Sequence, residues 1–223
     1  MTTRLHTSVA LALIGLSAVA VTHQAKACGL NLVRSANGQW MIAPPAKLSP
    51  AAAWQMSMAE ATRNVAAAAQ PKTKAMPNPL QFLEPITGLW YYTQTAEGNG
   101  PGTPDGTLID FGFQAWHADG GEFMNSGTLP PPSGNFCEGT WAQTGAHTYQ
   151  LNHFALSWDN TGTVYIGPAN IREDITLSND NNSMSGDFSI TQYAPDGSTV
   201  IAYVKGTLKG TRETLDSPAP VTP

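Results

Sequence analysis

Histidine residues within predicted strands are the groups in this sequence best suited to proton transfer. His117 ends one predicted strand, and His153 lies in the middle of another. An imidazole changes its charge near neutral pH, so two of them inside one cavity would supply a general acid and a general base. His117 shares a face of its strand with Phe111 and Phe113, and these apolar companions favour an inward direction. The face of His153 is mixed and leaves its direction open.

Arg172 and Tyr149 are candidates to stabilise negative charge that develops during such a reaction. Alternation along a strand predicts that Glu173 shares a face with Ile171 and Ile175, opposite Arg172. An inward Arg172 would hold a carboxylate or phenolate through two parallel hydrogen bonds. An outward Arg172 in a surface ion ladder is the simpler alternative.

A metal site is another use for the same histidines. His117 and Asp119 would be two ligands from one strand face, with Glu122 as a further candidate. The remaining ligands do not fall at a recognised spacing. The sequence also contains no nucleophile elbow, phosphate-binding loop or dinucleotide fingerprint. We therefore predict no metal and no dissociable cofactor.

Aromatic side chains in the same strands could line a pocket for an apolar or aromatic ligand. The candidates are Phe113, Trp116, Phe154 and Trp158. Packing of these rings in an ordinary core is the alternative.

The elements that would position these residues are short strands. The sequence has 21 glycines, 17 prolines and only 12 % charged residues, which favours an antiparallel β protein with many short connections. From residue 86 onward, period-two alternation is broken by turn signals at strand-like spacing. The predicted strands are 89–95, 108–117, 122–127, 139–143, 149–158, 164–177, 184–193 and 200–212. We predict an all-β fold, an antiparallel meander β-barrel of eight to nine strands over 86–216, which can hold one small ligand or fill itself with side chains.

The first 27 residues have the pattern of a secretory signal peptide. Arg4 precedes an apolar stretch from Val9 to Val21, and Ala25-Lys26-Ala27 is a small-x-small cleavage site. The apolar stretch is too short to span a bilayer, which needs about 20 residues. We expect an exported protein, periplasmic or secreted, without a transmembrane segment after cleavage. Cys28 directly after the site raises the alternative of a lipoprotein, which Lys26 disfavours.

The charge of the chain excludes two classes of partner. The formal net charge is −5, and removal of Arg4 and Lys26 makes it more negative. No basic run is present that could neutralise several phosphates, so nucleic acid is not an expected partner. The same charge argues against anionic membrane surfaces.

Residues 28–85 differ in composition from the barrel region. The Ala-rich segment 51–69 predicts one short helix between proline-rich stretches. This extension would act as a strap or linker, or alternatively as a lid or dimer arm. In an oxidising compartment, Cys28 and Cys137 are expected to form a disulfide that pins the extension to the barrel. Residues 217–223 are expected to form a disordered tail.

The barrel region resembles the calycin pattern of lipocalins. The first strand carries Gly88-Leu89-Trp90, and Arg212 lies near the end of the last. The resemblance implies that Trp90 sits at the closed end of the barrel with Arg212 packed over its ring, a structural cation–π contact. The chain departs from lipocalins because it lacks their T-D-Y-like loop motif and the helix after the last strand. Allene oxide cyclase-like barrels are a rival class.

The sequence is also similar to uncharacterised exported bacterial proteins that share Trp116-His117-Ala118-Asp119-Gly120 and the stretch from Leu151 to Leu156. This likeness implies no activity. Three functional hypotheses follow from the residues. The first is an exported barrel that binds a small apolar or aromatic molecule in its cavity. The second is a cofactor-independent lyase or isomerase that uses interior histidines. The third is a filled barrel that acts through its surface.

Overall fold

The computed structural model describes residues 24–27, 30–35, 37–38, 40–42, 84–221 and 223. The Ala-rich segment 51–69, for which we predicted a helix, lies outside the described residues. Cys28 and residues 1–23 lie outside them as well.

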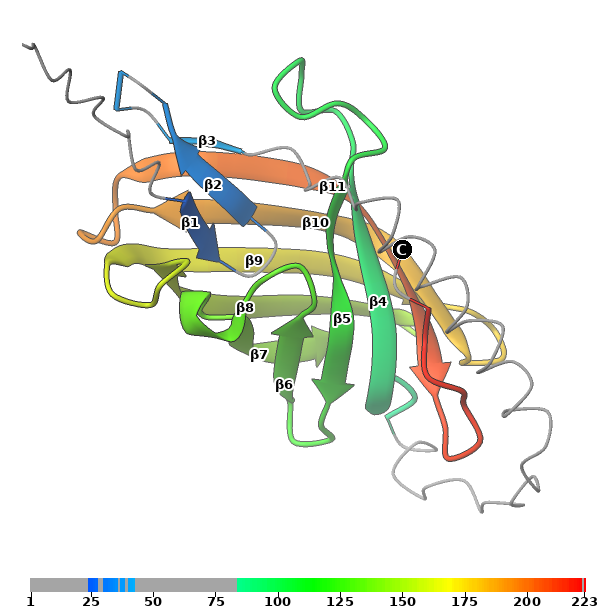
Figure 1. Cartoon of the computed structure of the whole chain (residues 1–223). Helices are drawn as coiled ribbons and strands as arrows, with labels where there is room; N and C mark the ends of the chain where they lie inside the picture. Colours follow the sequence, from blue (N-terminus) through cyan, green and yellow to red (C-terminus); the bar gives the residue numbers. More distant parts are fainter. Residues whose placement is uncertain (1–23, 28–29, 36, 39, 43–83, 222) are drawn as a thin grey trace, which may run out of the picture.

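Eight antiparallel strands form a closed barrel, coloured green to red in Figure 1. They are β4 (Gly88–Ala96), β5 (Leu108–Trp116), β6 (Gly121–Ser126), β7 (Phe136–Gln143), β8 (Thr148–Asp159), β9 (Tyr165–Leu177), β10 (Ser183–Tyr193) and β11 (Val200–Glu213). Each strand pairs with the next along the chain, and β11 pairs back with β4. Closure leaves these strands without an open sheet edge. The predicted all-β meander barrel is therefore confirmed.

The turns between strands are held by short polar side chains. Asp159 accepts hydrogen bonds from the amides of Thr163 (2.8 Å) and Val164 (3.1 Å), and Gly162 adopts a positive φ of 71°. Asp196 accepts two amide bonds in the β10–β11 turn in the same way. These local motifs set where one strand ends and the next begins.

Three further strands extend the sheet beyond the barrel. They were not among the predicted strands. They are β1 (Gln24–Ala27), β2 (Leu30–Arg34) and β3 (Trp40–Ile42). The backbone of β1 pairs with β2 and with the end of β8, at Ala25 with Asp159 and Lys26 with Trp158. Leu30 and Leu32 are completely buried. Strands this short carry too few alternations to stand out from a loop in the sequence.

The prediction that Phe111 and Phe113 face the barrel interior was wrong. Along β5, Asp110 and Gln114 are completely buried in the interior, whereas Phe111 and Phe113 are partly buried on the outer face. The two phenylalanines pack against Tyr91 there, with ring centroids 6.5 and 5.7 Å away. The rings thus bury their apolar surface outside the barrel, and the interior at this level is polar.

Trp90 and Arg212 pack together at one end of the barrel. The guanidinium carbon of Arg212 lies 4.2 Å from the centroid of the Trp90 ring. Arg212 also donates hydrogen bonds to the carbonyl oxygens of Thr87, Pro85 and Asn181. The contact implied by the calycin resemblance is present, and the barrel is compatible with a calycin-like fold. Within the described part of the chain, no helix has the length and apolar character to cross a membrane.

Candidate functional site in the barrel interior

Five polar side chains from five strands meet inside the barrel. They are Gln94 (β4), Gln114 (β5), Glu122 (β6), His153 (β8) and Glu173 (β9), and we call them the interior polar cluster. Each is at most 1 % exposed. Burial of so many polar groups is costly unless they bond to one another or to a guest. A cluster of this kind is therefore the default place to look for function.

His153 lies between two carboxyl groups. Its Nδ1 atom is 3.2 Å from Glu122 Oε2, and its Nε2 atom is 3.9 Å from Glu173 Oε1. Burial alone lowers the pKa of His153, but the negative charges of Glu122 and Glu173 outweigh this effect and raise it. A protonated imidazole is thus favoured at this position.

Glu173 is held by the two glutamines. Gln114 Nε2 donates to both of its carboxylate oxygens, at 3.0 and 2.9 Å, and Gln94 Nε2 donates to Oε1 at 2.9 Å. Burial raises the pKa of Glu173 to about 7, although nearby His153 and the glutamine bonds act in the opposite direction. Glu173 can therefore gain or lose a proton near neutral pH.

Gly139 makes the approach of Glu122 and His153 possible. It stands between them in the strand register, opposite Glu122 on one side and His153 on the other. A Cβ atom at this position would lie 2.4 Å from His153 Cβ and 3.0 Å from Glu122 Oε2. The missing side chain on β7 thus provides the space in which two side chains from β6 and β8 meet. The local sequence around Gly139 did not identify it as a site residue.

Several buried polar atoms of the site have no hydrogen-bond partner. They are the Oε1 atoms of Gln94 and Gln114, both carboxylate oxygens of Glu122, both ring nitrogens of His153, and Trp116 Nε1. The approach of His153 to Glu122 brings opposite charges together but does not have the alignment of a hydrogen bond. Buried polar atoms in folded proteins nearly always have partners, including bound water. Bound water or a polar guest would supply the partners that these atoms lack.

Asp110 forms a second buried polar group with a different character. It accepts hydrogen bonds at 2.8 Å from Tyr92, Ser126 and Thr128 side chains and from the Phe111 amide. Burial raises the pKa of Asp110 despite these bonds. Its oxygens are satisfied by the protein itself, so we interpret Asp110 as a structural tie between β4, β5 and β6.

Aromatic rings lie beside the interior polar cluster. Trp116, Trp141 and Tyr149 form a group with ring centroids 5.8 to 6.5 Å apart. Trp116 stands directly opposite Glu122 in the pairing of β5 with β6. Of the predicted site residues, Trp116, Tyr149 and His153 therefore face the interior together.

The other predicted site residues lie elsewhere. His117 is exposed and packs edge-on against Phe123, with centroids 5.2 Å apart, so it does not meet His153. Alternation explains the error, because Trp116 takes the inward position and the next residue must face out. Arg172 is also exposed, and its Nε donates to Asn170. An inward role for His117 or Arg172 is therefore wrong.

The predicted ligand-lining residues divide in the same way. Phe154 is 51 % exposed on the outer face of β8. Phe113 belongs to the outer aromatic group with Tyr91, and Trp158 is partly buried against Tyr165, with centroids 5.3 Å apart. Only Trp116 of this set has the position that the prediction gave it.

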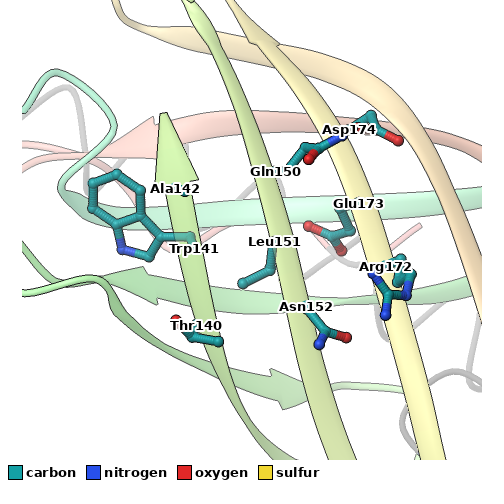
Figure 2. Close-up of a pocket in the computed structure, with 9 residues that line it drawn as sticks. All are labelled: Thr140, Trp141, Ala142, Gln150, Leu151, Asn152, Arg172, Glu173 and Asp174. Carbon is teal, nitrogen blue, oxygen red and sulfur yellow. Dashed lines mark hydrogen bonds between the residues drawn. The ribbon is translucent and has the colours of Figure 1, made fainter. Parts of the chain in front are cut away.

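The barrel wall also carries a depression of about 270 Å³ across β7, β8 and β9, shown in Figure 2. Its lining includes the exposed Arg172, and Gln150 Nε2 donates to Asp174 Oδ1 at 2.7 Å across it. Ligand pockets usually enclose about 300–1,000 Å³ and are largely apolar. This small polar depression is a weaker candidate than the interior.

The arrangement of the acidic groups does not suit a metal ion. Glu122 and Glu173 approach opposite nitrogens of His153, so the three side chains do not converge on one point. Among the described residues, no group of three His, Cys, Asp or Glu side chains could hold a metal. The chemistry open to the cluster is hydrogen bonding, charge pairing and proton transfer.

Neither protein-family models nor curated proteins gave a match to this sequence. The closed meander with Trp90 and Arg212 at one end is compatible with a calycin-like architecture. An architecture of this kind hosts many unrelated activities, so function has to be inferred from the site itself.

Proposed function

We propose that this protein is an exported, lipocalin-like barrel that binds a small molecule in its interior. The apolar or aromatic body of the ligand packs on Trp116, Trp141 and Tyr149, and its polar group bonds to the interior polar cluster. One observation carries the proposal: buried polar atoms from four strands lack hydrogen-bond partners on the interior side.

The free-energy cost of buried polar atoms without partners favours a bound guest. A buried donor or acceptor without a partner costs about 1–3 kcal/mol. Such atoms include the Oε1 atoms of Gln94, Gln114 and Glu122. A protein that only needed a filled core would be more stable with apolar residues of similar volume at these positions. The polar residues are better explained by a bound polar group.

The test is native mass spectrometry of the protein purified from its own source, beside a denatured control. A small molecule that leaves on denaturation is the expected result. Gly139→Val should abolish its retention, because the new side chain enters the space between Glu122 and His153. Thr140→Val, on the exposed outer face of the same strand, is the matched control and should retain the molecule.

Two outcomes would contradict the proposal. One is a bare mass from the native source that remains bare after incubation with a small-molecule extract of the same source. The other is a ligand retained equally by Gly139→Val and the parent protein. Either result would favour a filled barrel that acts through its surface. Thermal unfolding of both variants distinguishes loss of binding from loss of fold.

Proton transfer is a second candidate function, a lyase or isomerase reaction without a cofactor. The specific observation is that His153 stands between two carboxyl groups, one of which has a pKa of about 7. One group could then take a proton from a bound ligand while the other returns one. We would incubate the co-purified ligand with protein in D₂O and follow deuterium at its carbon atoms. Uptake that depends on His153 supports an enzyme, and its absence leaves the binding function alone.

A further inference from the structure

The unpartnered atoms of the interior contain more acceptors than donors. Three oxygens have neither a hydrogen bond nor an ion pair, one each on Gln94, Gln114 and Glu122. Each carbonyl or carboxylate oxygen can accept about two hydrogen bonds. The nitrogens without a hydrogen bond and not facing Glu122 are His153 Nε2 and Trp116 Nε1, which supply at most two N–H groups. A guest that satisfies this surplus must be mainly a donor.

The orientation of the two glutamine amides supports this assignment. Both direct their Nε2 groups to Glu173, at 2.9 to 3.0 Å. Because a carboxylate accepts and an amide oxygen does not donate, the Oε1 atoms must face away from Glu173. The two oxygens are therefore free to accept from something else.

The charges of the interior also favour a guest that donates hydrogen bonds. Asp110, Glu122 and Glu173 are three buried carboxyl groups, and His153 is the one buried imidazole that faces them among the described residues. The buried residues of the described chain include no lysine or arginine. Arg212 already donates hydrogen bonds to backbone carbonyl oxygens at one end of the barrel. With His153 protonated, the buried carboxyl groups still outnumber the buried positive charges.

The neighbouring rings suit a cation as well. Trp116 lies opposite Glu122 in the strand register, and Trp141 and Tyr149 pack around it. The face of an indole or phenol attracts a positive charge, most strongly where water is excluded.

We propose that the interior site binds a small organic cation, a protonated amine that carries an apolar or aromatic group. The juxtaposition that supports it is the Oε1 atom of Glu122, which has no partner, on a residue that pairs with His153 and stands opposite Trp116 in the strand register. An ammonium group supplies three N–H donors and one positive charge, and the apolar group packs on the rings. This inference rests on the proposed binding function and names the ligand class for the same site.

The experiment compares three compounds with the same phenethyl body by isothermal titration calorimetry. They are 2-phenylethylamine, 2-phenylethanol and 3-phenylpropionate, whose polar ends are cationic, neutral and anionic at pH 7. We expect the amine to bind about tenfold or more tightly than either of the others. Glu122→Gln should remove most of this preference. Glu138→Gln, the same change at an exposed position of β7, should keep it.

A second readout does not depend on variants. A cation bound beside Glu173 favours its ionised carboxylate, so amine binding at pH 7 should release protons. The groups that face this position are His153, Glu122, Asp110 and Glu173 itself. Titrations in two buffers with different ionisation enthalpies measure this release, and 2-phenylethanol should cause none.

The outcomes separate the two proposals. Equal or tighter binding of the alcohol or the carboxylate overturns the cation but leaves a ligand-binding barrel. Failure of all three compounds also overturns the cation, and native mass spectrometry then decides whether any ligand is held. An amine that binds the parent and Glu122→Gln equally, without proton release, shows that it lies outside this site and overturns the assignment.

Discussion

His153 Nδ1 and Glu122 Oε2 approach to 3.2 Å in the completely buried interior of the barrel, across the gap that Gly139 leaves in β7. Neither residue is near the other in the sequence, and neither strand is bonded to the other. The closeness depends on a missing side chain in the strand between them. It places an ionisable pair where water is excluded.

Gly139→Ala should destabilise the protein by about 1–3 kcal/mol, because the added methyl group would clash with the His153 side chain on the neighbouring strand. The new Cβ would lie 2.4 Å from His153 Cβ. Urea unfolding measures the loss. Gly102→Ala is the matched control, because a Cβ there meets no atom within 4 Å. Equal stability of the two variants would show that the interior around His153 is loosely packed.

Stability should fall as pH rises from about 4.5 to above 7. The folded pKa of Glu173 is raised from 4.5 to about 7, and the pKa of His153 is raised from 6.5. The folded state therefore binds more protons than the unfolded state in this range, and the stability from both groups is lost as they deprotonate. For Glu173 the effect is on the order of 3 kcal/mol. Urea midpoints measured between pH 5 and pH 8 test the sign.

The pH effect has a specific control. Glu173→Gln should flatten the dependence between pH 5 and pH 7, because a neutral amide does not titrate there. Hydrogen bonds hold the pKa of the turn carboxylate Asp196 at about 2, so its contribution is lost only below about pH 4 and does not overlap. A parent protein that becomes more stable toward pH 8 would contradict the burial of the cluster.

Tyr92→Phe should cost about 1–2 kcal/mol, because it removes one hydrogen bond to the buried Asp110. The other bonds to Asp110 remain, so the protein should still fold. Tyr91→Phe is the control on the same strand, because its hydroxyl donates to the Val221 carbonyl on the outside. Chemical unfolding of the pair compares an inner with an outer hydroxyl, and a larger loss for Tyr91→Phe would reverse our assignment of faces in β4.

Arg212→Lys should lower stability by about 1–3 kcal/mol. A lysine cannot stack on Trp90 and also bond to the carbonyl oxygens of Thr87, Pro85 and Asn181. Arg172→Lys, at an exposed position of β9, should change stability by less than about 0.5 kcal/mol. Thermal unfolding of the parent protein and both variants measures these changes. Similar losses of stability in the two variants would mean that the contacts of Arg212 contribute little to stability.

Export and the disulfide remain predictions that one mass measurement can check. Cleavage after Ala27 would leave a chain that begins at Cys28 and would remove β1, whose backbone pairs with β2 and β8. We expect the exported protein to have the mass of residues 28–223 less two hydrogens. The disulfide would then contribute about 4–5 kcal/mol in the chain-entropy model. A mass that retains residues 1–27, or a thiol that reacts with a labelling reagent, would contradict the expectation.

The strands and turns of the barrel were predictable from local sequence alone. All eight predicted ranges overlap β4 to β11, because each strand is bounded by glycine, proline or aspartate turn motifs such as the one at Asp196. The shared face of Ile171, Glu173 and Ile175 was also correct, because side chains alternate along any strand. Local chemistry therefore determined the elements and the grouping of residues within each.

Only the tertiary structure decided which of the two faces points inward. In β5 the apolar face, with Phe111 and Phe113, lies outside, and Asp110 and Gln114 lie inside. Alternation cannot identify the inner face when the interior is polar and the outer wall carries its own aromatic group. The interior polar cluster was unpredictable for the same reason: its members come from five strands, and closure of the barrel and the gap at Gly139 bring them into contact.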